Sequence, residues 1–554
     1  MKAVLDVLRA AVADYCAAES IEFDPAAIQI EPPRDPKFGD FATNCVLQIA
    51  SRAKRKPRDV AGAVVERVLR ATDGQGSVIA KAEIAGPGFI NFTIDPRVWI
   101  RALEAVDREG EQYGWSRAER PERVQIEFVS ANPTGPLHVG HGRNAVVGDV
   151  CARLLEMTGH TVEREFYVND AGKQIMTLGA SVVARMREAR GEAGTFPEDG
   201  YPGQYVKEIA ARLVAEGVLP SDEPAAVRAI ALRAADVLKA VQKKDLDDLN
   251  VRFDVWFSET PLHEGGAVAA TIDDMTARGH IYDADGARWF RSTAFGDEKD
   301  RVVVRSNGEK TYFAADMAYH RNKFVERGFA RVMNVWGADH HGYIPRMKAI
   351  VSALGKPADA LEIVLVQFVN LTGGRMGKRT GNMVTLREVI DEVGRDAARF
   401  FFLLRSYNTT LEFDLDLAKR ESSDNPVYYV QYGHARIASL IAKAAEKGFS
   451  PPHFDAHFAD VLSLPEEVSI AKKLQEFPEV VRTAAALREP HRIPFYLMDI
   501  VGAFHAYYTK YKHDEKVVSD DREKTNARLF LLNVLRHVLA NGLAVVGVAA
   551  PEKM

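Results

Sequence analysis

The sequence predicts an α/β multidomain protein, and three observations lead to that fold class. At 554 residues the chain is too long for one hydrophobic core. Within residues 124–168, an apolar β-branched run, a loop rich in Gly and Pro, a helical repeat and a second apolar run follow one another. From residue 396 onward, apolar residues recur almost wholly at helical spacing. We therefore predict a central Rossmann-type domain with a helical insertion, an N-terminal α+β domain and a C-terminal α-helical bundle.

The composition is typical of a soluble globular protein, with 47% hydrophobic and 27% charged residues. No run of about 18 uninterrupted apolar residues occurs, so we predict no membrane span. The first helix-like segment carries Asp6 and Arg9 within its apolar pattern, which is not typical of a secretion signal. The three cysteines, Cys16, Cys45 and Cys151, are far apart in sequence. We therefore expect neither disulfides nor protein-bound zinc, and a cytoplasmic location.

Residues 1–105 predict a separate α+β module, which opens with helical spacing and contains a clear strand at 89–94. The formal net charge of the chain is −5, so an RNA partner would have to be bound by local basic patches. One such patch in this module is either a solvated helix end or a phosphate contact. It consists of Arg52, Lys54, Arg55, Lys56 and Arg58.

The central stretch predicts a β-loop-α-β unit. The run 124–129 is typical of a buried parallel strand, and 161–168 predicts the next strand. The helix between them ends near Gly159, a residue suited to the position just past a helix. His138 and His141 then lie at the entrance of this helix, three residues apart and on one face of its first turn.

That position suits phosphate binding, because a helix start offers free N–H groups and the positive end of the helix dipole. Gly140, between the two imidazoles, lets a ligand approach the backbone. The alternative is a capped helix with two polar surface histidines. The preceding buried strand and Gly/Pro loop favour the binding site.

At these residues the chain resembles a known family. The string His138-Val-Gly-His141 is similar to the His-Ile-Gly-His signature of class I aminoacyl-tRNA synthetases. The longer string from Ser130 to His141 closely resembles that of the arginyl-tRNA synthetase family, and the resemblance covers nearly the whole chain. It implies an additional domain at 1–105 that binds the tRNA elbow, a catalytic domain at 106–420 and a helical anticodon-binding domain at 421–554. Residues from about 175 to 290 are predicted to form the helical insertion.

The resemblance also implies an arginine pocket. Tyr312 and Asp316 are four residues apart, so they would face the same way at a helix start. A carboxylate matches a guanidinium with two hydrogen bonds, and an aromatic face adds a cation–π contact. From the spacing alone, an N-capping Asp and a half-buried Tyr are the favoured explanation of the pair. Glu127, Asn132 and His340 resemble residues that complete the pocket.

Two further segments point to ATP. A predicted strand at 332–336 runs into Gly337 and Asp339, where an open α/β sheet binds a nucleotide ribose. The Gly-rich basic loop at 372–382 resembles the second class I signature, Lys-Met-Ser-Lys-Ser, with departures at Arg375, Gly377 and Arg379. Lys378 takes the position that contacts phosphate; the alternative is an ordinary basic surface turn. The implied ATP-binding residues are Gly135, Pro136, Leu137, Gly140, Gly337, Asp339, Met376 and Arg379.

The implied tRNA contacts lie at the two ends of the chain. In the first module, Phe41 or Asn44 could stack on or hydrogen-bond an unpaired base. In the last, Tyr428, Tyr432 and Arg436 are spaced along one helix, where they either pack the bundle or stack RNA bases. A second candidate patch consists of Tyr507, Tyr508, Lys510, Tyr511 and Lys512.

The resemblance implies a monomeric ligase that acts on L-arginine, Mg²⁺-ATP and tRNA(Arg), with His138, His141 and Lys378 as catalytic residues. Three alternatives stay open. A class I synthetase for lysine, glutamate or cysteine would share both signatures. A small-molecule adenylyltransferase would share the first signature but would not need a helical C-terminal third of this size. A tRNA-binding relative without catalysis would not need the two histidines and the lysine.

Overall fold

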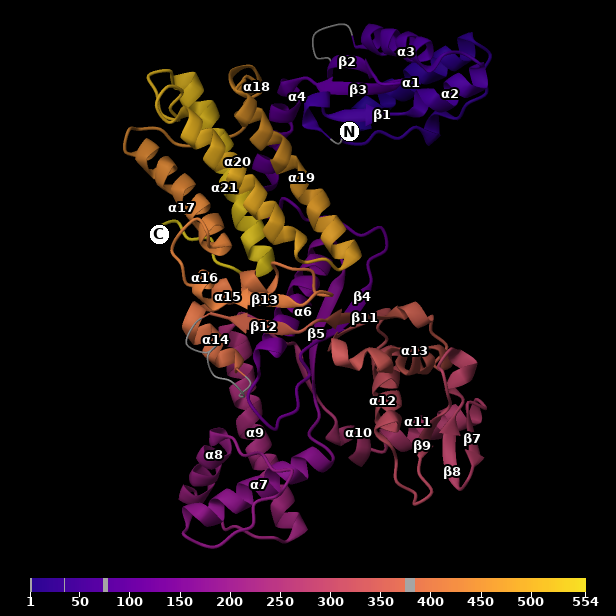
Figure 1. The fold of residues 1–554 in the computed structure, drawn as a ribbon, viewed down its shortest axis with the longest axis vertical. Helices are drawn as coiled ribbons and strands as arrows, with labels where there is room; N and C mark the ends of the chain where they lie inside the picture. The colour runs from indigo at the N-terminus through magenta and orange to yellow at the C-terminus, as the bar shows by residue number, and fades with distance from the viewer. Residues whose placement is uncertain (1, 34, 73–77, 374–383) are drawn as a thin grey trace. The chain divides into compact units, whose positions relative to one another are not determined.

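A computed structural model describes residues 2–33, 35–72, 78–373 and 384–554 (Figure 1). The chain divides into two compact units, and each is described by itself. Unit 1 comprises Met1–Gly110, Leu440–Gln475 and Ala503–Leu535. Unit 2 comprises Glu111–Ser439, Glu476–Gly502 and Arg536–Met554.

The N-terminal part of unit 1 is an α+β domain, as predicted. Its antiparallel sheet has the order β1-β3-β2, and the strands are β1 (Phe41–Thr43), β2 (Ile79–Ala85) and β3 (Phe89–Ile94). Alternate residues of β3 are buried, because one face of the sheet packs on helices. The helices are α1 (Lys2–Ala18), α2 (Cys45–Ala53), α3 (Pro57–Ala71), α4 (Pro96–Arg101) and α5 (Leu103–Glu109), with short turns η1 (Pro25–Ala27), η2 (Pro36–Phe38) and η3 (Gly110–Gln112).

Unit 2 is built on a five-stranded parallel sheet of the order β11-β10-β4-β5-β6. Read from β6, the chain order of these strands is 3-2-1-4-5, the Rossmann arrangement that was predicted. The first and fourth strands in chain order, β4 and β10, are neighbours, so the connections leave them in opposite directions. Ligands bind at the carboxyl ends of such a pair. The strands are β4 (Arg123–Glu127), β5 (Thr161–Val168), β6 (Val255–Ser258), β10 (Arg331–Gly337) and β11 (Leu361–Val366).

Helix α6 (Val139–Met157) connects β4 to β5 and is buried on nearly all sides. A helix that is buried all round belongs to the core of a large domain. At Gly148 a Cβ atom would collide with the ring of Phe128, so this glycine lets the helix approach the sheet. Gly159 has a φ of +90° just past the helix, as predicted.

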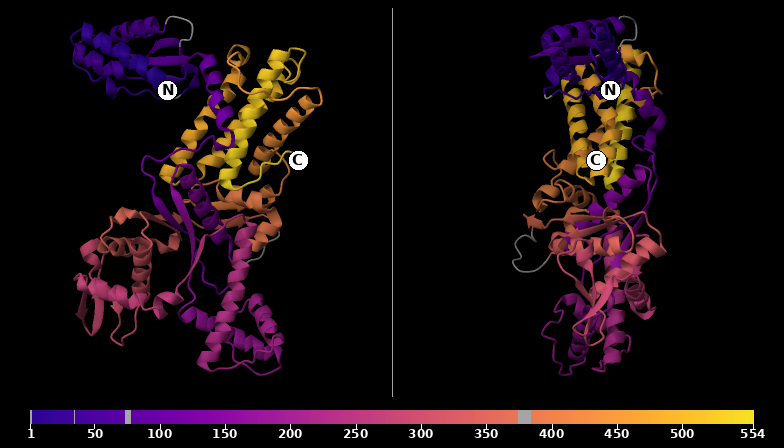
Figure 2. Two further views of the ribbon diagram at one scale, coloured as in Figure 1. Left: turned by 180° about the vertical axis from the view of Figure 1, so that it is seen from behind. Right: turned by 90° about the vertical axis from the view of Figure 1, so that its right-hand side faces the viewer.

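Three helices after β5 form a separate cluster with its own apolar core: α7 (Lys173–Ala189), α8 (Gln204–Ala215) and α9 (Pro224–Asp248) (Figure 2). The predicted insertion at 175–290 was too long, because β6 lies within it and belongs to the parallel sheet. A second core follows β6. It includes α10 (Thr260–Glu264), α11 (Ala267–Ala277), β7 (Ile281–Ala284), β8 (Ala287–Phe290), η4 (Ser292–Phe295), β9 (Arg301–Val304), α12 (Tyr312–Arg321) and α13 (Ile344–Ala353).

The apolar segment 362–371 does not form one continuous strand. The chain forms β11 and then β12 (Val369–Thr372), which pairs in parallel with β13 (Leu411–Asp414) in a second sheet. The break coincides with Arg143 of α6, a buried side chain whose guanidinium donates to the carbonyls of Gln367 (2.9 Å), Thr409 (2.8 Å) and Ser406 (2.9 Å). Arg143 thus joins the backbone at Gln367, between the two strands, to the segment that precedes β13.

The remaining segments are helical. Thr385 forms a capping box with Glu388 at the start of α14 (Leu386–Val393). Helix α21 is long and apolar enough to cross a membrane, but 67% of its most apolar window is buried in the structure, as in the core helix of a soluble protein. The elements are η5 (Asn322–Glu326), η6 (Ala338–Tyr343), η7 (Ala358–Ala360), α14 (Leu386–Val393), α15 (Arg395–Phe402), α16 (Leu415–Ala418), α17 (Pro426–Ala445), α18 (Phe458–Val461), α19 (Pro465–Leu487), α20 (Arg492–Tyr511) and α21 (Arg522–Val546).

Replacing Arg143 by Met should lower the free energy of unfolding by about 3 kcal/mol, because several carbonyls lose their donor in a buried place. Urea denaturation followed by circular dichroism measures the change. As a control, Arg305→Met removes an exposed guanidinium 3.4 Å from Glu309 and should change stability by less than about 0.5 kcal/mol. Equal effects of the two substitutions would contradict the role given to Arg143.

Candidate active site

The site lies where β4 and β10 end. After β4 the backbone takes positive φ angles at Val129 (66°) and Ser130 (43°). Such angles are uncommon for residues other than glycine and rarest for a β-branched residue such as Val129. Two side chains hold this turn: Asn144 Oδ1 accepts from the amide of Val129 (2.7 Å), and Ser130 Oγ accepts from the amide of Tyr167 (3.1 Å). Asn144 Nδ2 also donates to the carbonyl of Val335 on β10 (3.0 Å). One buried amide therefore joins the ends of both strands.

The two histidines of the first signature form a stacked pair at the start of α6. His138 is the N-cap residue, and its Nδ1 accepts from the amides of Gly140 (3.1 Å) and His141 (3.4 Å). Nδ1 of His141 accepts in turn from the amide of His138 (3.2 Å). The ring centroids are 3.6 Å apart. Because both Nδ1 atoms are acceptors, each neutral ring carries its proton on Nε2.

Both rings are neutral at pH 7. Burial lowers the pKa of His141 to about 3, and a charge on His138 would lower it further. Burial also lowers the pKa of His138, although the negative charge of Asp339 opposes that change. The pair therefore offers two Nε2–H donors and no formal charge beside the helix N-terminus. Such donors can stabilise negative charge that develops on a bound phosphate.

The loop before the histidines connects to the chain that follows the second signature. Leu137 is fully buried, and its carbonyl accepts from the amide of Leu386 (2.7 Å). The amide of Val139 donates to the carbonyl of Val384 (3.1 Å), and His138 forms an isolated β-bridge with Thr385. Val384 and Thr385, the first described residues after the second signature, therefore lie beside His138. Lys378, Met376 and Arg379 lie outside the described residues.

Across the gap between the strands, Gly337 ends β10 and Asp339 follows on η6. A Cβ atom on residue 337 would lie 2.5 Å from Asp339 Oδ1, so glycine is needed for the carboxylate to fold back over the backbone. His340 Nε2 lies 3.6 Å from Asp339 Oδ2, and both side chains are exposed. The carboxylate of Asp339 is thus exposed just after β10, where a nucleotide ribose is expected to bind.

Tyr312 and Asp316 lie one turn apart on α12, as predicted. Tyr312 is 62% exposed, whereas Asp316 is half-buried. Burial and the negative charges of Glu259 and Glu127 raise the pKa of Asp316 to about 7. Three carboxylates therefore act on one another in this pocket. A bound cation would relieve their repulsion.

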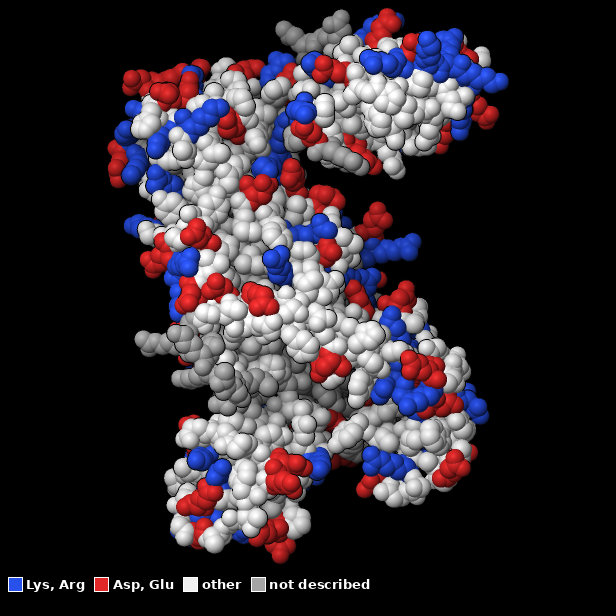
Figure 3. Space-filling model, viewed as in Figure 1, with Lys and Arg blue, Asp and Glu red and all other residues white. Residues whose placement is uncertain are grey.

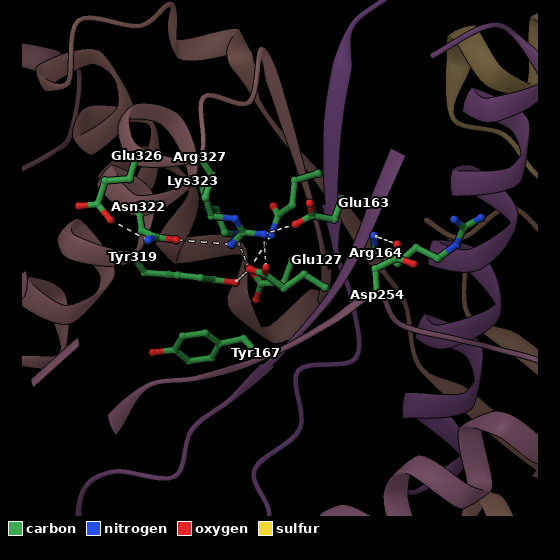
Figure 4. Close-up of polar contacts among 12 residues, drawn as sticks. Glu127, Glu163, Arg164, Tyr167, Asp254, Tyr319, Asn322, Lys323, Glu326 and Arg327 are labelled. Carbon is green, nitrogen blue, oxygen red and sulfur yellow. Dashed lines mark hydrogen bonds and ion pairs between the residues drawn. The ribbon is translucent and has the colours of Figure 1, made fainter. Parts of the chain in front are cut away.

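Glu127 and Asn132, two other predicted arginine ligands, both have protein partners. Glu127 Oε2 accepts from Lys323 Nζ (2.5 Å) (Figure 4). Its Oε1 accepts from Ser130 Oγ (3.0 Å). Asn132 Nδ2 donates to Gln174 Oε1 (2.6 Å). Their contact with arginine stays a prediction.

Glu259 was not predicted as a site residue. It is 3% exposed, directly follows β6, and its Oε1 lies 2.9 Å from His263 Nε2. Its charge raises the pKa of both Asp316 and the half-buried Tyr167. An acidic residue just after a short aromatic run was the available signal, because strand ends of a parallel sheet meet at one edge.

The helical insertion holds the signature loop, which the sequence did not reveal. Gln242 of α9 is buried, and its Nε2 donates to the carbonyls of Asn132 (3.1 Å) and Gly135 (2.8 Å). The hydroxyl of Tyr205 on α8 donates to the carbonyl of Thr134 (2.9 Å). The loop that leads to the histidines is therefore fixed by two helices of the insertion.

The predicted RNA contacts of the first module differ in exposure. Phe41 is 9% exposed, and its ring centroid lies 6.4 Å from that of Trp99, so it belongs to the domain core. Asn44 is exposed at the N-cap of α2 and makes no capping hydrogen bond with its side chain. Base contacts by either residue stay a prediction.

The C-terminal candidates form two sets. On α17, Tyr428 and Tyr432 stack with centroids 6.0 Å apart, and Arg436 donates to the hydroxyl of Tyr432 (2.9 Å). In unit 1, a cavity of about 190 Å³ combines aromatic and basic side chains. It is lined by Leu440, Lys443, Lys447, Tyr507, Tyr508, Tyr511, Lys512, Glu515, Lys516, Val517 and Val518.

Replacing Gln242 by Leu should lower the free energy of unfolding by about 1 to 2 kcal/mol, because two loop carbonyls lose their donor. The loss is moderate, since Gln242 Oε1 itself has no partner within the described residues. Urea denaturation measures the change, with the exposed neighbour Lys243→Leu as the control. A stability unchanged in Gln242→Leu would show that the insertion does not hold the loop.

Comparisons with known proteins agree with this geometry. Models of the families "tRNA synthetases class I (R), catalytic domain", "Arginyl tRNA synthetase N terminal domain" and "DALR anticodon binding domain" match residues 103–410, 2–94 and 430–554. An arginine–tRNA ligase of Citrifermentans bemidjiense is 49% identical over 535 residues, which cover 95% of each chain. One of Desulfosudis oleivorans is 50% identical over 536 residues, with the same coverage.

The fold is also similar to a solved structure. The Thermus thermophilus arginyl-tRNA synthetase superposes with a TM-score of 0.73 at 22% identity, covering 100% of both chains. These findings confirm the resemblance seen in the string from Ser130 to His141. The chain belongs to the arginyl-tRNA synthetase (arginine–tRNA ligase) family.

Proposed function

We propose that this chain activates L-arginine with ATP and transfers the arginyl group to the terminal adenosine of tRNA(Arg). Its family membership supports this over the lysine, glutamate and cysteine ligases, a free-standing adenylyltransferase and a non-catalytic relative. The observation that carries the proposal is the cluster of Glu127, Glu259 and Asp316, in the same sheet-edge site as a neutral histidine pair.

In the first step, the arginine carboxylate attacks the α-phosphorus of ATP, and the bond to pyrophosphate breaks. Mg²⁺ enters with the nucleotide as part of the substrate. His138 and His141 donate from Nε2 to the phosphate oxygens, and the start of α6 adds its dipole. Asp339 accepts from the ribose, while Gly135, Pro136, Leu137, Gly140 and Gly337 let the nucleotide approach the backbone. Lys378, with Met376 and Arg379, offsets charge on the departing pyrophosphate.

The guanidinium binds Asp316, and the ring of Tyr312 covers it. Glu127, Asn132 and His340 complete the arginine site. Glu259 adds negative potential, since its charge already acts on Asp316. In the second step, the 2′-hydroxyl of the terminal adenosine takes the arginyl group and AMP leaves. No protein side chain has to form a covalent bond, so catalysis rests on positioning and electrostatics.

Binding of tRNA is better explained by local basic and aromatic patches than by a uniformly positive surface. On the face drawn in Figure 3, Lys and Arg side chains alternate with Asp and Glu. Tyr428, Tyr432 and Arg436, together with the lysine- and tyrosine-lined cavity of unit 1, supply stacking surfaces and phosphate contacts in the anticodon-binding domain. Asn44 and Phe41 would meet the tRNA elbow. The protein would work as a cytoplasmic monomer.

The experiment that tests the function is arginine-dependent exchange of pyrophosphate into ATP, with and without tRNA, followed by charging of total tRNA with each amino acid. Exchange and charging with arginine alone are the expected result. Charging of another amino acid would overturn the assignment of substrate. Exchange that proceeds fully without RNA would favour a small-molecule adenylyltransferase.

The affinity for arginine should depend on pH through Asp316. Because its pKa is raised to about 7, the carboxyl is mostly neutral at pH 6 and mostly ionised at pH 8. The KM for arginine should therefore fall roughly tenfold from pH 6 to pH 8, while the KM for ATP changes little. Pyrophosphate exchange measures both constants.

In Asp316→Ala the KM for arginine should rise by roughly 10- to 100-fold and lose this pH dependence, because a charge-assisted hydrogen bond is removed. The KM for ATP serves as the internal control. A parallel rise in both constants would contradict the guanidinium assignment.

A further inference from the structure

We propose that Lys323 is a positioning residue that acts through Glu127 to set the charge and orientation of the arginine pocket. This inference rests on the proposed arginine-activating function. Lys323 lies on η5, a single π-helical turn that extends α12 just after Asp316. Turns of this kind often occur at functional sites, because they shift the register of the side chains that follow.

The contacts of Lys323 are all buried. The side chain is 0% exposed, and its Nζ donates to Glu127 Oε2 (2.5 Å) and Asn334 Oδ1 (3.2 Å) (Figure 4). Nζ also lies 4.1 Å from the ring centroid of Tyr319. Lys323, on the turn that extends α12, therefore contacts Glu127 at the carboxyl end of β4 and Asn334 on β10. These two strands flank the site.

A second cation, at the C-cap of this turn, has different partners. Arg327 pairs with Glu163 and with Glu165 on β5. Glu165 also accepts from the hydroxyl of Tyr319 (2.5 Å) and from Gln125 Nε2 (2.7 Å). Arg327 thus binds the turn to the sheet without touching Glu127. The ion pairs of Arg327 already fix the turn to the sheet. The buried contact between Lys323 and Glu127 therefore needs a different explanation.

Burial of an ammonium is unfavourable unless a partner compensates for it, and here the partner is a pocket carboxylate. Lys323 and Ser130 Oγ each bind one oxygen of Glu127, which leaves one lone pair on each oxygen for a substrate N–H. Although burial works against ionisation, the charge of Lys323 and its hydrogen bond hold the pKa of Glu127 below its ordinary value. The carboxylate is therefore ionised and fixed before arginine arrives.

Lys323 also acts on Asp316, because its positive charge opposes the burial and the two neighbouring carboxylates that raise the pKa of that group. Without Lys323, Glu127 and Asp316 would both bind protons more readily, and the pocket would lose its attraction for a guanidinium. The ionisable groups that interact with Glu127 or Asp316 include Lys323, His320, Tyr319, Tyr167, Glu259 and Arg346. Of these, His320 is neutral at pH 7, since burial lowers its pKa to about 4.

The test is pyrophosphate exchange by Lys323→Met, which keeps the length of the side chain and removes its charge. The KM for arginine should rise roughly 30-fold or more at pH 7, whereas the KM for ATP stays within about twofold. The affinity of Lys323→Met for arginine should improve as the pH is raised, because without the lysine the pocket carboxyls ionise only at higher pH. Lys323→Arg, which restores a cation, should recover most of the loss. The matched control is Arg327→Gln at the C-cap of the same turn, which should lower thermal stability with little effect on either KM.

A double-mutant cycle separates positioning from support of the fold. If Lys323 acts through Glu127, adding Lys323→Met to Glu127→Gln raises the KM for arginine no further. The double variant also leaves no unpaired charge, so it should fold even if Lys323→Met does not. The inference would be overturned if the effects of Lys323→Met and Glu127→Gln on the KM for arginine multiplied in the double variant. It would also be overturned if Arg327→Gln raised that KM as much as Lys323→Met does. Absence of arginine-dependent exchange in the unmodified protein would instead overturn the proposed function.

Discussion

Three carboxylates lie close enough to perturb one another in the pocket, and this repulsion is the constraint on which the site depends. Glu127 ends β4, Glu259 follows β6 and Asp316 lies on α12, so the fold brings them together from three distant segments. Lys323 neutralises one of them from within the protein. The remaining negative charge makes the pocket selective for a cation with a planar set of donors.

The histidine pair meets the opposite requirement. A phosphate that gains negative charge needs hydrogen-bond donors. Permanently charged side chains beside the acidic pocket would, however, compete with the guanidinium of arginine for the pocket carboxylates. Stacking and burial keep His138 and His141 neutral and leave their Nε2–H groups as donors. The amide of Asn144 keeps the ends of β4 and β10 together, so both halves of the site share one rigid frame. The insertion steadies the loop between them through Gln242 and Tyr205.

Much of the fold could be predicted because local patterns were strong. The strand at 161–168 and the helix end at Gly159 follow from patterns of adjacent residues, and the structure has both. Strand β6 was missed because four residues are too few for a periodic signal. The break after β11 was missed because it depends on Arg143, more than two hundred positions earlier in the chain. Glu127 was recognised from its motif, but Lys323, 196 positions away, could be found only from the fold.

The most direct test of the account is the number of protons released when arginine binds. Titration calorimetry at pH 7, in two buffers with different ionisation enthalpies, measures that number. Since the pKa of Asp316 is raised to about 7, the account predicts release of about half a proton per site. It also predicts no release in Asp316→Asn. Binding with no proton release, or with proton uptake, would show that the pocket does not hold the guanidinium against a shared excess of negative charge.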